Sequence, residues 1–189
     1  MLTGRMRRLL IIAGVLVLLI IVAVVLFRMQ TKSFSPEADT RFLDNYIKIE
    51  VFYNRPFKKG REIFGGLVPY GEVWRTGANE ATIFKTNVDL LIMDKVLKAG
   101  SYTLWTIPGE QDWTIIFNSE VGQWGVDFVN GKANRDQRKD VLQVEVPVFK
   151  HGKEIEQFTI MVEKTGESIE LNLMWDATLV SVPIAVVLQ

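Results

Sequence analysis

The sequence predicts an all-β fold class, with a single β-sandwich domain of jelly-roll-like type after one N-terminal transmembrane helix. Three observations predict this fold class. An unbroken apolar run lies near the N-terminus, segments with period-two alternation follow it, and turns rich in Gly and Pro separate those segments. The 189 residues leave room for one domain of ordinary size and an appendage.

Composition excludes several classes of function. The chain has no Cys and one His, which argues against disulfides, thiolate metal sites, Cys nucleophiles and catalysis by two His. Lys and Arg number 22, Asp and Glu also number 22, and the net charge is zero. This balance does not indicate a nucleic-acid partner. We therefore expect no cofactor, no metal and no nucleic acid.

The N-terminal segments predict a membrane anchor. Residues 1–8 are basic, and residues 9–27 form an apolar run whose helix would be about 29 Å long, close to the hydrocarbon thickness of a bilayer. The run is longer than the core of a cleavable signal peptide and lacks a small-x-small cleavage motif. An uncleaved signal anchor is favoured, and a cleaved signal stays the alternative.

Charge predicts the orientation of this anchor. Arg5, Arg7 and Arg8 precede the apolar run and outweigh Arg28 and Lys32 behind it. The positive-inside rule then places the N-terminus in the cytoplasm. We expect a single-pass protein of the inner membrane with its main domain in the periplasm, and the lipid bilayer as the partner of the apolar run.

The remaining chain reads as a tether and a domain. Residues 28–44 are polar and are predicted to be a short tether, and residues 45–189 are predicted to be the β-sandwich. Strand candidates in this domain are rich in Val, Ile, Thr, Phe and Trp. They are residues 46–53, 81–85, 88–93, 101–107, 113–118, 140–146, 157–163, 168–174 and 178–187.

Residues 55–82 are the segment most indicative of a site, because Gly and Pro punctuate it while Arg and aromatic residues crowd it. Arg side chains suit carboxylate or phosphate, aromatic rings form flat walls, and Asn and Glu can bond a sugar. The candidate ligand-binding residues are Arg55, Lys59, Arg61, Tyr70, Trp74, Arg75, Asn79 and Glu80, with Trp124 from a later loop.

A structural interpretation of the same residues competes with the functional one. Arg75 could pair with Glu80 inside the loop, Asn79 could cap a turn through its own backbone, and Trp74 could plug the end of the sandwich. Trp105 lies in a strand candidate, where a core position is favoured over a sugar-stacking platform.

Several longer motifs carry a family resemblance. Arg55-Pro56, Leu67-Val68-Pro69-Tyr70-Gly71, Trp74 to Thr82, Thr106-Ile107-Pro108-Gly109 and Trp113 to Asn118 together resemble the signature of the family of unknown function numbered 2911. The resemblance covers nearly all of residues 45–185. It implies an exported bacterial protein built on one β-rich domain, with no established activity. Lys98 replaces the Pro usual before Ala-Gly, and the anchor departs from the cleaved signal common in the family.

Three functions are compatible with these observations. The first is a membrane-anchored periplasmic binding module for a carbohydrate, a peptide or an envelope protein. The second is a structural or assembly partner of an envelope protein. The third is a hydrolase that uses Glu80 with Asp89 or another carboxylate as acid and base.

Overall fold

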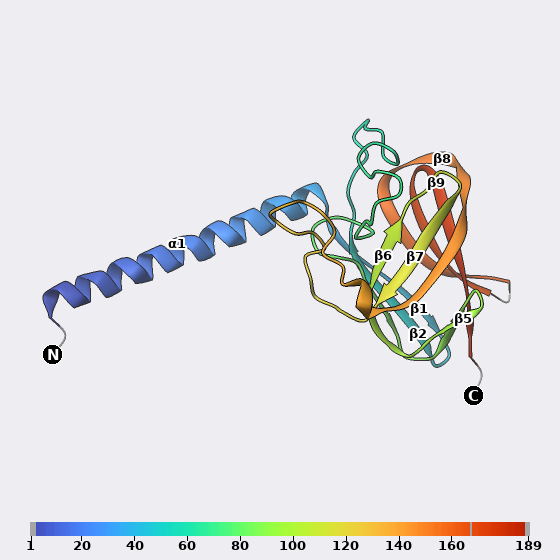
Figure 1. Cartoon of the computed structure of the whole chain (residues 1–189), viewed down its shortest axis with the longest axis horizontal. Coiled ribbons are helices and arrows are strands. Elements are labelled where there is room, and N and C mark those ends of the chain that lie inside the picture. Colours follow the sequence, from blue (N-terminus) through green and yellow to red (C-terminus); the bar gives the residue numbers. More distant parts are fainter. Residues whose placement is uncertain (1–2, 167, 188–189) are drawn as a thin grey trace. The chain divides into compact units, whose positions relative to one another are not determined.

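The chain folds into a helical unit that ends at Phe34 and a β-domain that begins at Ser35 (Figure 1). The structure is a computed structural model and describes residues 3–166 and 168–187. Within the described ranges it contains one long helix, nine strands and one short 3-10 helix. The predicted fold class, an all-β domain after one apolar helix, is confirmed.

Helix α1 spans Gly4–Phe34, and none of its described side chains is buried. It has 31 residues, so at 1.5 Å per residue it is about 46 Å long. Within the described ranges it is the one helix long and apolar enough to cross a membrane, a property that membrane spans and signal sequences share.

Residues 28–44, the predicted short tether, contain regular secondary structure. Helix α1 continues to Phe34, and strand β1 (Glu37–Asp44) begins three residues later. The Ser33 hydroxyl donates to the carbonyl oxygen three residues earlier at 2.7 Å, so a polar side chain here is accommodated within the helix. Pro36 cannot continue a helix, because it lacks an N–H and its ring clashes with the preceding turn.

The nine strands form one continuous antiparallel sheet in the order β1-β2-β3-β6-β7-β8-β9-β4-β5. A sandwich of two separate sheets is therefore not confirmed. The remaining bounds are β2 Ile47–Asn54, β3 Ile83–Thr86, β4 Leu90–Ile92, β5 Lys95–Leu97, β6 Gly100–Ile107, β7 Asp112–Asn118, the 3-10 helix η1 Gln137–Lys139, β8 Asp140–Thr165 and β9 Ser168–Val186.

Strands β8 and β9 are each longer than predicted. Residues 140–146 and 157–163 lie in one strand, because the chain continues in an extended form through the Gly152 region, which looked like a turn. The register against β9 shifts after Lys150 and again after Ile155. Such irregularities bend a strand, and β8 accordingly pairs with β7 through its first part and with β9 through the rest.

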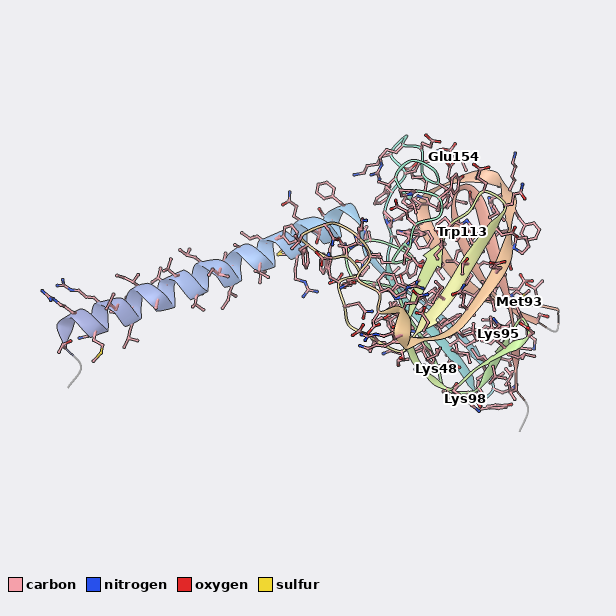
Figure 2. The ribbon with its side chains drawn as sticks, viewed as in Figure 1. Lys48, Met93, Lys95, Lys98, Trp113 and Glu154 are labelled. Carbon is pink, nitrogen blue, oxygen red and sulfur yellow. The ribbon has the colours of Figure 1, made fainter. Side chains whose placement is uncertain are left out.

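The main core lies on one face of this sheet and contains side chains from both ends of it. On β2, Val51 and Tyr53 are buried, as period-two alternation requires. The Tyr53 hydroxyl accepts from the Ile160 N–H at 2.9 Å and donates to the Ile160 carbonyl at 3.3 Å, which connects β2 to β8. Trp113 lies among the strands, whereas Lys98 and Glu154 lie at opposite ends of the domain (Figure 2).

The other face of the first strands positions the candidate site. The register places Glu37 opposite Asn54 and Asp39 opposite Phe52, so polar side chains of β1 and β2 share this outer face. Further across the same face, Trp105 lies opposite Ile116 and forms a second, smaller buried cluster with it.

Candidate functional site

Residues 74–82 form a closed loop on strand β6. Trp74 and Thr106 exchange two backbone hydrogen bonds of 2.7 and 3.0 Å, and the Thr82 carbonyl accepts from the Leu104 N–H at 2.8 Å. The Thr82 hydroxyl donates to the Thr76 carbonyl at 2.7 Å, which fastens the two ends of the loop together. The loop therefore holds the residues between its ends at defined positions.

The backbone of this loop adopts unusual conformations. Thr76 has φ of 53° although it is β-branched and fully buried, and the left-handed region is rarely occupied by such residues. A hydrogen bond of 3.2 Å between the Thr76 and Thr106 hydroxyls keeps the side chain in place. At Gly77 a Cβ would lie 3.0 Å from the Asn54 carbonyl oxygen, so the loop packs directly against the end of β2.

Asn54 connects the loop to the first two strands. Its amide nitrogen donates to Glu80 Oε2 at 3.2 Å, and its amide oxygen accepts from Asn79 Nδ2 at 3.4 Å. Asn79 also donates to the Ser35 carbonyl at 3.3 Å. Asn79 thus bonds to segments that are distant in the sequence. Asn54 has no distinctive sequence signal, since its role depends on the contact between the end of β2 and the loop.

A pocket of about 450 Å³ lies beside this network. Its walls come from β1, β2, the loop and the start of β3. Its lining residues are Glu37, Ala38, Asp39, Phe52, Tyr53, Asn54, Glu80, Ala81 and Ile83. Its size is within the range of small-molecule sites. Because three of these side chains are carboxylates and none is basic, the pocket favours ligands that carry amino or hydroxyl groups. We call it the acidic pocket.

Three of the basic residues of the predicted site contact different groups of the domain. Arg55 donates through Nε to the Phe158 carbonyl at 3.0 Å and through Nη2 to the Thr159 hydroxyl at 2.8 Å. Arg61 donates from Nε to a backbone carbonyl within its own turn at 3.0 Å. The Lys59 side chain lies over the Phe57 ring at 5.9 Å. Arg61 and Lys59 contact groups of their own turn, whereas Arg55 reaches β8, and a sequence pattern does not specify these contacts.

Arg75 is separate from these basic residues and is largely removed from solvent. Its Nη1 donates to the Trp124 carbonyl at 3.4 Å. In the part of the chain that the structure describes, no carboxylate lies within 4.0 Å of its guanidinium, so the expected ion pair with Glu80 is not formed. Burial lowers the pKa of Arg75, and the nearby charge of Glu80 opposes that decrease.

Trp74 packs against the core. Its ring stacks on Trp175 at a centroid distance of 6.0 Å and meets Trp113 and Phe158 edge-on at 6.1 and 5.0 Å. Its Nε1 donates to the Gly77 carbonyl at 2.9 Å. Trp74 therefore closes the core beneath the loop, as the structural interpretation expected.

The two more exposed aromatic candidates lie on other loops. Tyr70 is 41 % exposed, and its ring covers Gly65, where a Cβ would lie 2.8 Å from the ring. Partial burial, followed by the charges of Glu110 and Glu62, raises the pKa of Tyr70. Trp124 is half-buried and packs against Phe128 at 5.9 Å. Neither residue lines the acidic pocket.

The remaining chemistry of the site is limited. Asp89 bonds to Lys98 and to the Ala99 N–H, each at 2.8 Å, and it follows β3 whereas Glu80 precedes it. The strand thus separates the two carboxylates of the hydrolase hypothesis. Within the described ranges, no three His, Asp or Glu side chains are grouped closely enough to hold a metal ion.

Comparisons with known proteins identify a family. The model of a family described as a protein of unknown function (DUF2911) matches residues 35–184. No curated protein and no solved structure matches the chain.

Proposed function

Since the chain belongs to the DUF2911 family, whose function is unknown, we propose from its own site that it is a membrane-anchored periplasmic binding domain. The acidic pocket is the ligand site, and α1 is the anchor. The basic residues Arg5, Arg7 and Arg8 before the apolar run support a cytoplasmic N-terminus. This orientation leaves the β-domain outside the inner membrane.

The acidic pocket is the observation that carries the proposal. Glu37 and Glu80 supply negative charge, and Asn54 supplies an amide at the pocket wall. The third carboxylate, Asp39, is ion-paired with Arg41 at 2.7 Å. The bonds from Asn54 to Glu80 and from Asn79 to Asn54 hold these polar groups in place before a ligand arrives, which reduces the entropic cost of binding. The ligand class is a carbohydrate or peptide that carries amino groups.

Titration calorimetry with the full-length protein in a neutral detergent tests the binding function. The probes are a glucosamine tetramer and its fully N-acetylated form, which differ in charge but share a backbone. We expect the charged tetramer to bind more tightly, and Glu80→Gln to weaken it about ten-fold, equivalent to one lost charged contact. Glu72→Gln, an exposed acid outside the pocket, is the matched control. Equal affinities for both tetramers, or an unchanged affinity in Glu80→Gln, would contradict the proposal.

Reporter fusions test the location. Alkaline phosphatase fused after the last residue is expected to be active, because that enzyme matures only outside the cytoplasm. Mass spectrometry of the membrane-bound chain distinguishes an anchor, which retains residues 1–27, from a signal that is removed. An inactive phosphatase fusion would contradict the orientation, and a shortened chain would contradict the anchor.

A further inference from the structure

Three buried side-chain donors at loop 119–136 find no hydrogen-bond acceptor in the part of the chain that the structure describes. They are the indole Nε1 of Trp105, the amide Nε2 of Gln123 and Nη1 of Arg135, of which the last has an ion-pair partner, Asp140 Oδ2 at 3.2 Å. Trp105 is fully buried, so solvent does not reach its N–H. Buried donors are nearly always satisfied in folded proteins, by protein groups or by ordered water. The donors of Trp105 and Gln123 can therefore each bond to an acceptor from outside the chain.

Arg75 lies at the same place. Gly125 has φ of 95°, and a Cβ there would lie 2.7 Å from Arg75 Cδ and 3.1 Å from Ala81 Cβ. Ala81 belongs to the same buried cluster as Trp105, and its N–H donates to the Gln123 carbonyl at 3.3 Å. We call Arg75, Trp105 and Gln123 the donor cluster.

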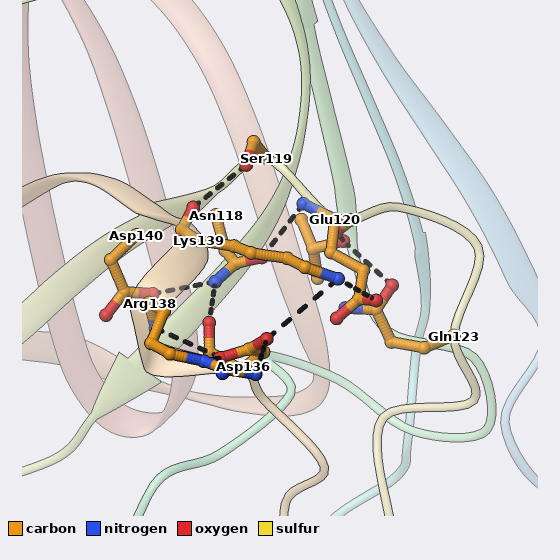
Figure 3. Close-up of polar contacts among 9 residues, drawn as sticks. Asn118, Ser119, Glu120, Gln123, Asp136, Arg138, Lys139 and Asp140 are labelled. Carbon is orange, nitrogen blue, oxygen red and sulfur yellow. Dashed lines mark hydrogen bonds and ion pairs between the residues drawn. The ribbon is translucent and has the colours of Figure 1, made fainter.

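The loop that supplies Gln123 is fastened at both ends. Asn118 is fully buried and donates to the Asp136 carbonyl at 2.9 Å and to Asp140 Oδ1 at 2.8 Å. Its own side-chain oxygen accepts from the Glu120 N–H at 2.9 Å. Figure 3 shows this network beside Gln123. These bonds therefore fix the two ends of the loop that carries Gln123.

The groups of the donor cluster that face no acceptor are all hydrogen-bond donors. A guanidinium, an indole N–H and an amide N–H all donate, and the Arg75 bond to the Trp124 carbonyl is long at 3.4 Å. Arg135 of the same loop differs, because its Nη1, although it makes no hydrogen bond, lies in an ion pair 3.2 Å from Asp140 Oδ2. Among the described residues no ion pair is formed by Arg75, and a planar guanidinium is suited to a carboxylate.

We propose that the donor cluster is an anion site that takes a carboxylate group. The carboxylate oxygens accept from the Arg75 guanidinium, the Trp105 indole N–H and the Gln123 amide. The site lies across residue 81 from the acidic pocket, which Ala81 also lines. The proposal of an anion site does not depend on the function proposed for the acidic pocket.

Nuclear magnetic resonance of the ¹⁵N-labelled full-length protein in a neutral detergent tests the site. Sodium acetate replaces sodium chloride at constant ionic strength, and the five tryptophan indole N–H signals are followed, with Trp105 assigned from Trp105→Phe. We expect the Trp105 signal to move and saturate. Trp74, whose Nε1 already donates to the Gly77 carbonyl, is the internal reference and should stay in place.

Two variants separate the anion site from a merely structural cluster. Arg75→Ala and Gln123→Leu are each expected to weaken the acetate response at least ten-fold, and Gln123→Leu carries the test if the Arg75 variant does not fold. Arg61→Ala removes an exposed cation and should leave the acetate response unchanged.

A linear, unsaturated drift of all five signals would indicate an adventitious ion only and would overturn the proposal. A saturable response that survives in both variants would also overturn it. Glu80→Gln should keep the acetate response, so this proposal and the acidic pocket can fail separately.

Discussion

Trp74 illustrates how a single aromatic residue of the loop contributes to stability. It contacts Phe158, Trp113 and Trp175 at the end of the core. Its removal would leave a cavity among rings that cannot collapse onto one another, so we expect Trp74→Ala to lower the free energy of unfolding by about 3–5 kcal/mol.

Urea denaturation of the purified protein measures this loss. Trp124→Ala is the matched control, because Trp124 is half-buried in a loop, and its loss should cost about 1 kcal/mol or less. Similar losses in both variants would contradict the core role of Trp74.

A single carboxylate, that of Asp136, makes the stability of the domain depend on pH. It accepts from Arg138 Nε and Nη2, each at 2.9 Å, and from the Arg138 backbone N–H at 3.1 Å. The pKa of Asp136 is lowered to about 2, chiefly by its hydrogen bonds with the Arg138 side chain. Because the pKa of Asp136 is lower in the folded than in the unfolded state, its ionised form stabilises the folded state. This stabilisation is complete above the unfolded-state pKa of about 4. It is lost as the pH falls through the folded-state pKa.

A carboxyl carbon titration by nuclear magnetic resonance tests this assignment. We expect Asp136 to titrate near the lowered value and Arg138→Ala to raise its pKa towards that of an ordinary Asp. An Asp136 midpoint that does not respond to Arg138→Ala would show that another group lowers the pKa.

At the scale of elements, Arg55 connects the end of β2 to β8. Its guanidinium donates to the Phe158 carbonyl and the Thr159 hydroxyl, and Gln157 Nε2 donates back to the Arg55 carbonyl at 3.1 Å. Hydrogen bonds from a charged group that is half-buried are worth about 1.5–3 kcal/mol. We therefore expect Arg55→Ala to destabilise the domain by about 2 kcal/mol and to speed amide exchange near Phe158.

Arg61→Ala is the comparison for this prediction. Arg61 is exposed and bonds within its own turn, so its replacement should change stability by about 0.5 kcal/mol or less. Hydrogen exchange with mass spectrometry locates the effect. Unchanged protection of β8 in Arg55→Ala would contradict the connection.

The fold shows where element prediction from sequence succeeds. Alternating apolar residues predicted β2, β6 and β7 nearly at their observed bounds, because each has one face in the core. The same reasoning missed β1, whose buried side chain is Phe42 alone, and β5, which has only three residues. It also divided β8 and β9. In β8, the local signal of Gly152 does not reveal that strand pairing continues through an irregularity.

At the scale of the whole molecule, the β-domain is expected to fold without the helix. The core cluster contains no residue of α1, and no described side chain of α1 is buried. We therefore expect residues 35–189 to unfold in one cooperative transition, with a thermal midpoint within a few degrees of that of the full chain in detergent.

Circular dichroism on both chains measures these midpoints. The comparison also tests solubility, because the shortened chain lacks the exposed apolar run and should remain monodisperse without detergent. A broad, uncooperative transition in residues 35–189 would show that the helix contributes to the fold.

The sequence by itself determined the fold class, the apolar helix and the family, because these follow from local periodicity, length and motif order. It also drew attention to the loop from Trp74 to Glu80. Only the tertiary structure decided which loop residues face a pocket, as with Glu80, and which enter the core, as with Trp74. The carboxylates of β1 and the amide of Asn54 were missed, since they meet Glu80 through strand register and chain reversal. Such contacts join residues that are distant in sequence, and no local pattern specifies them.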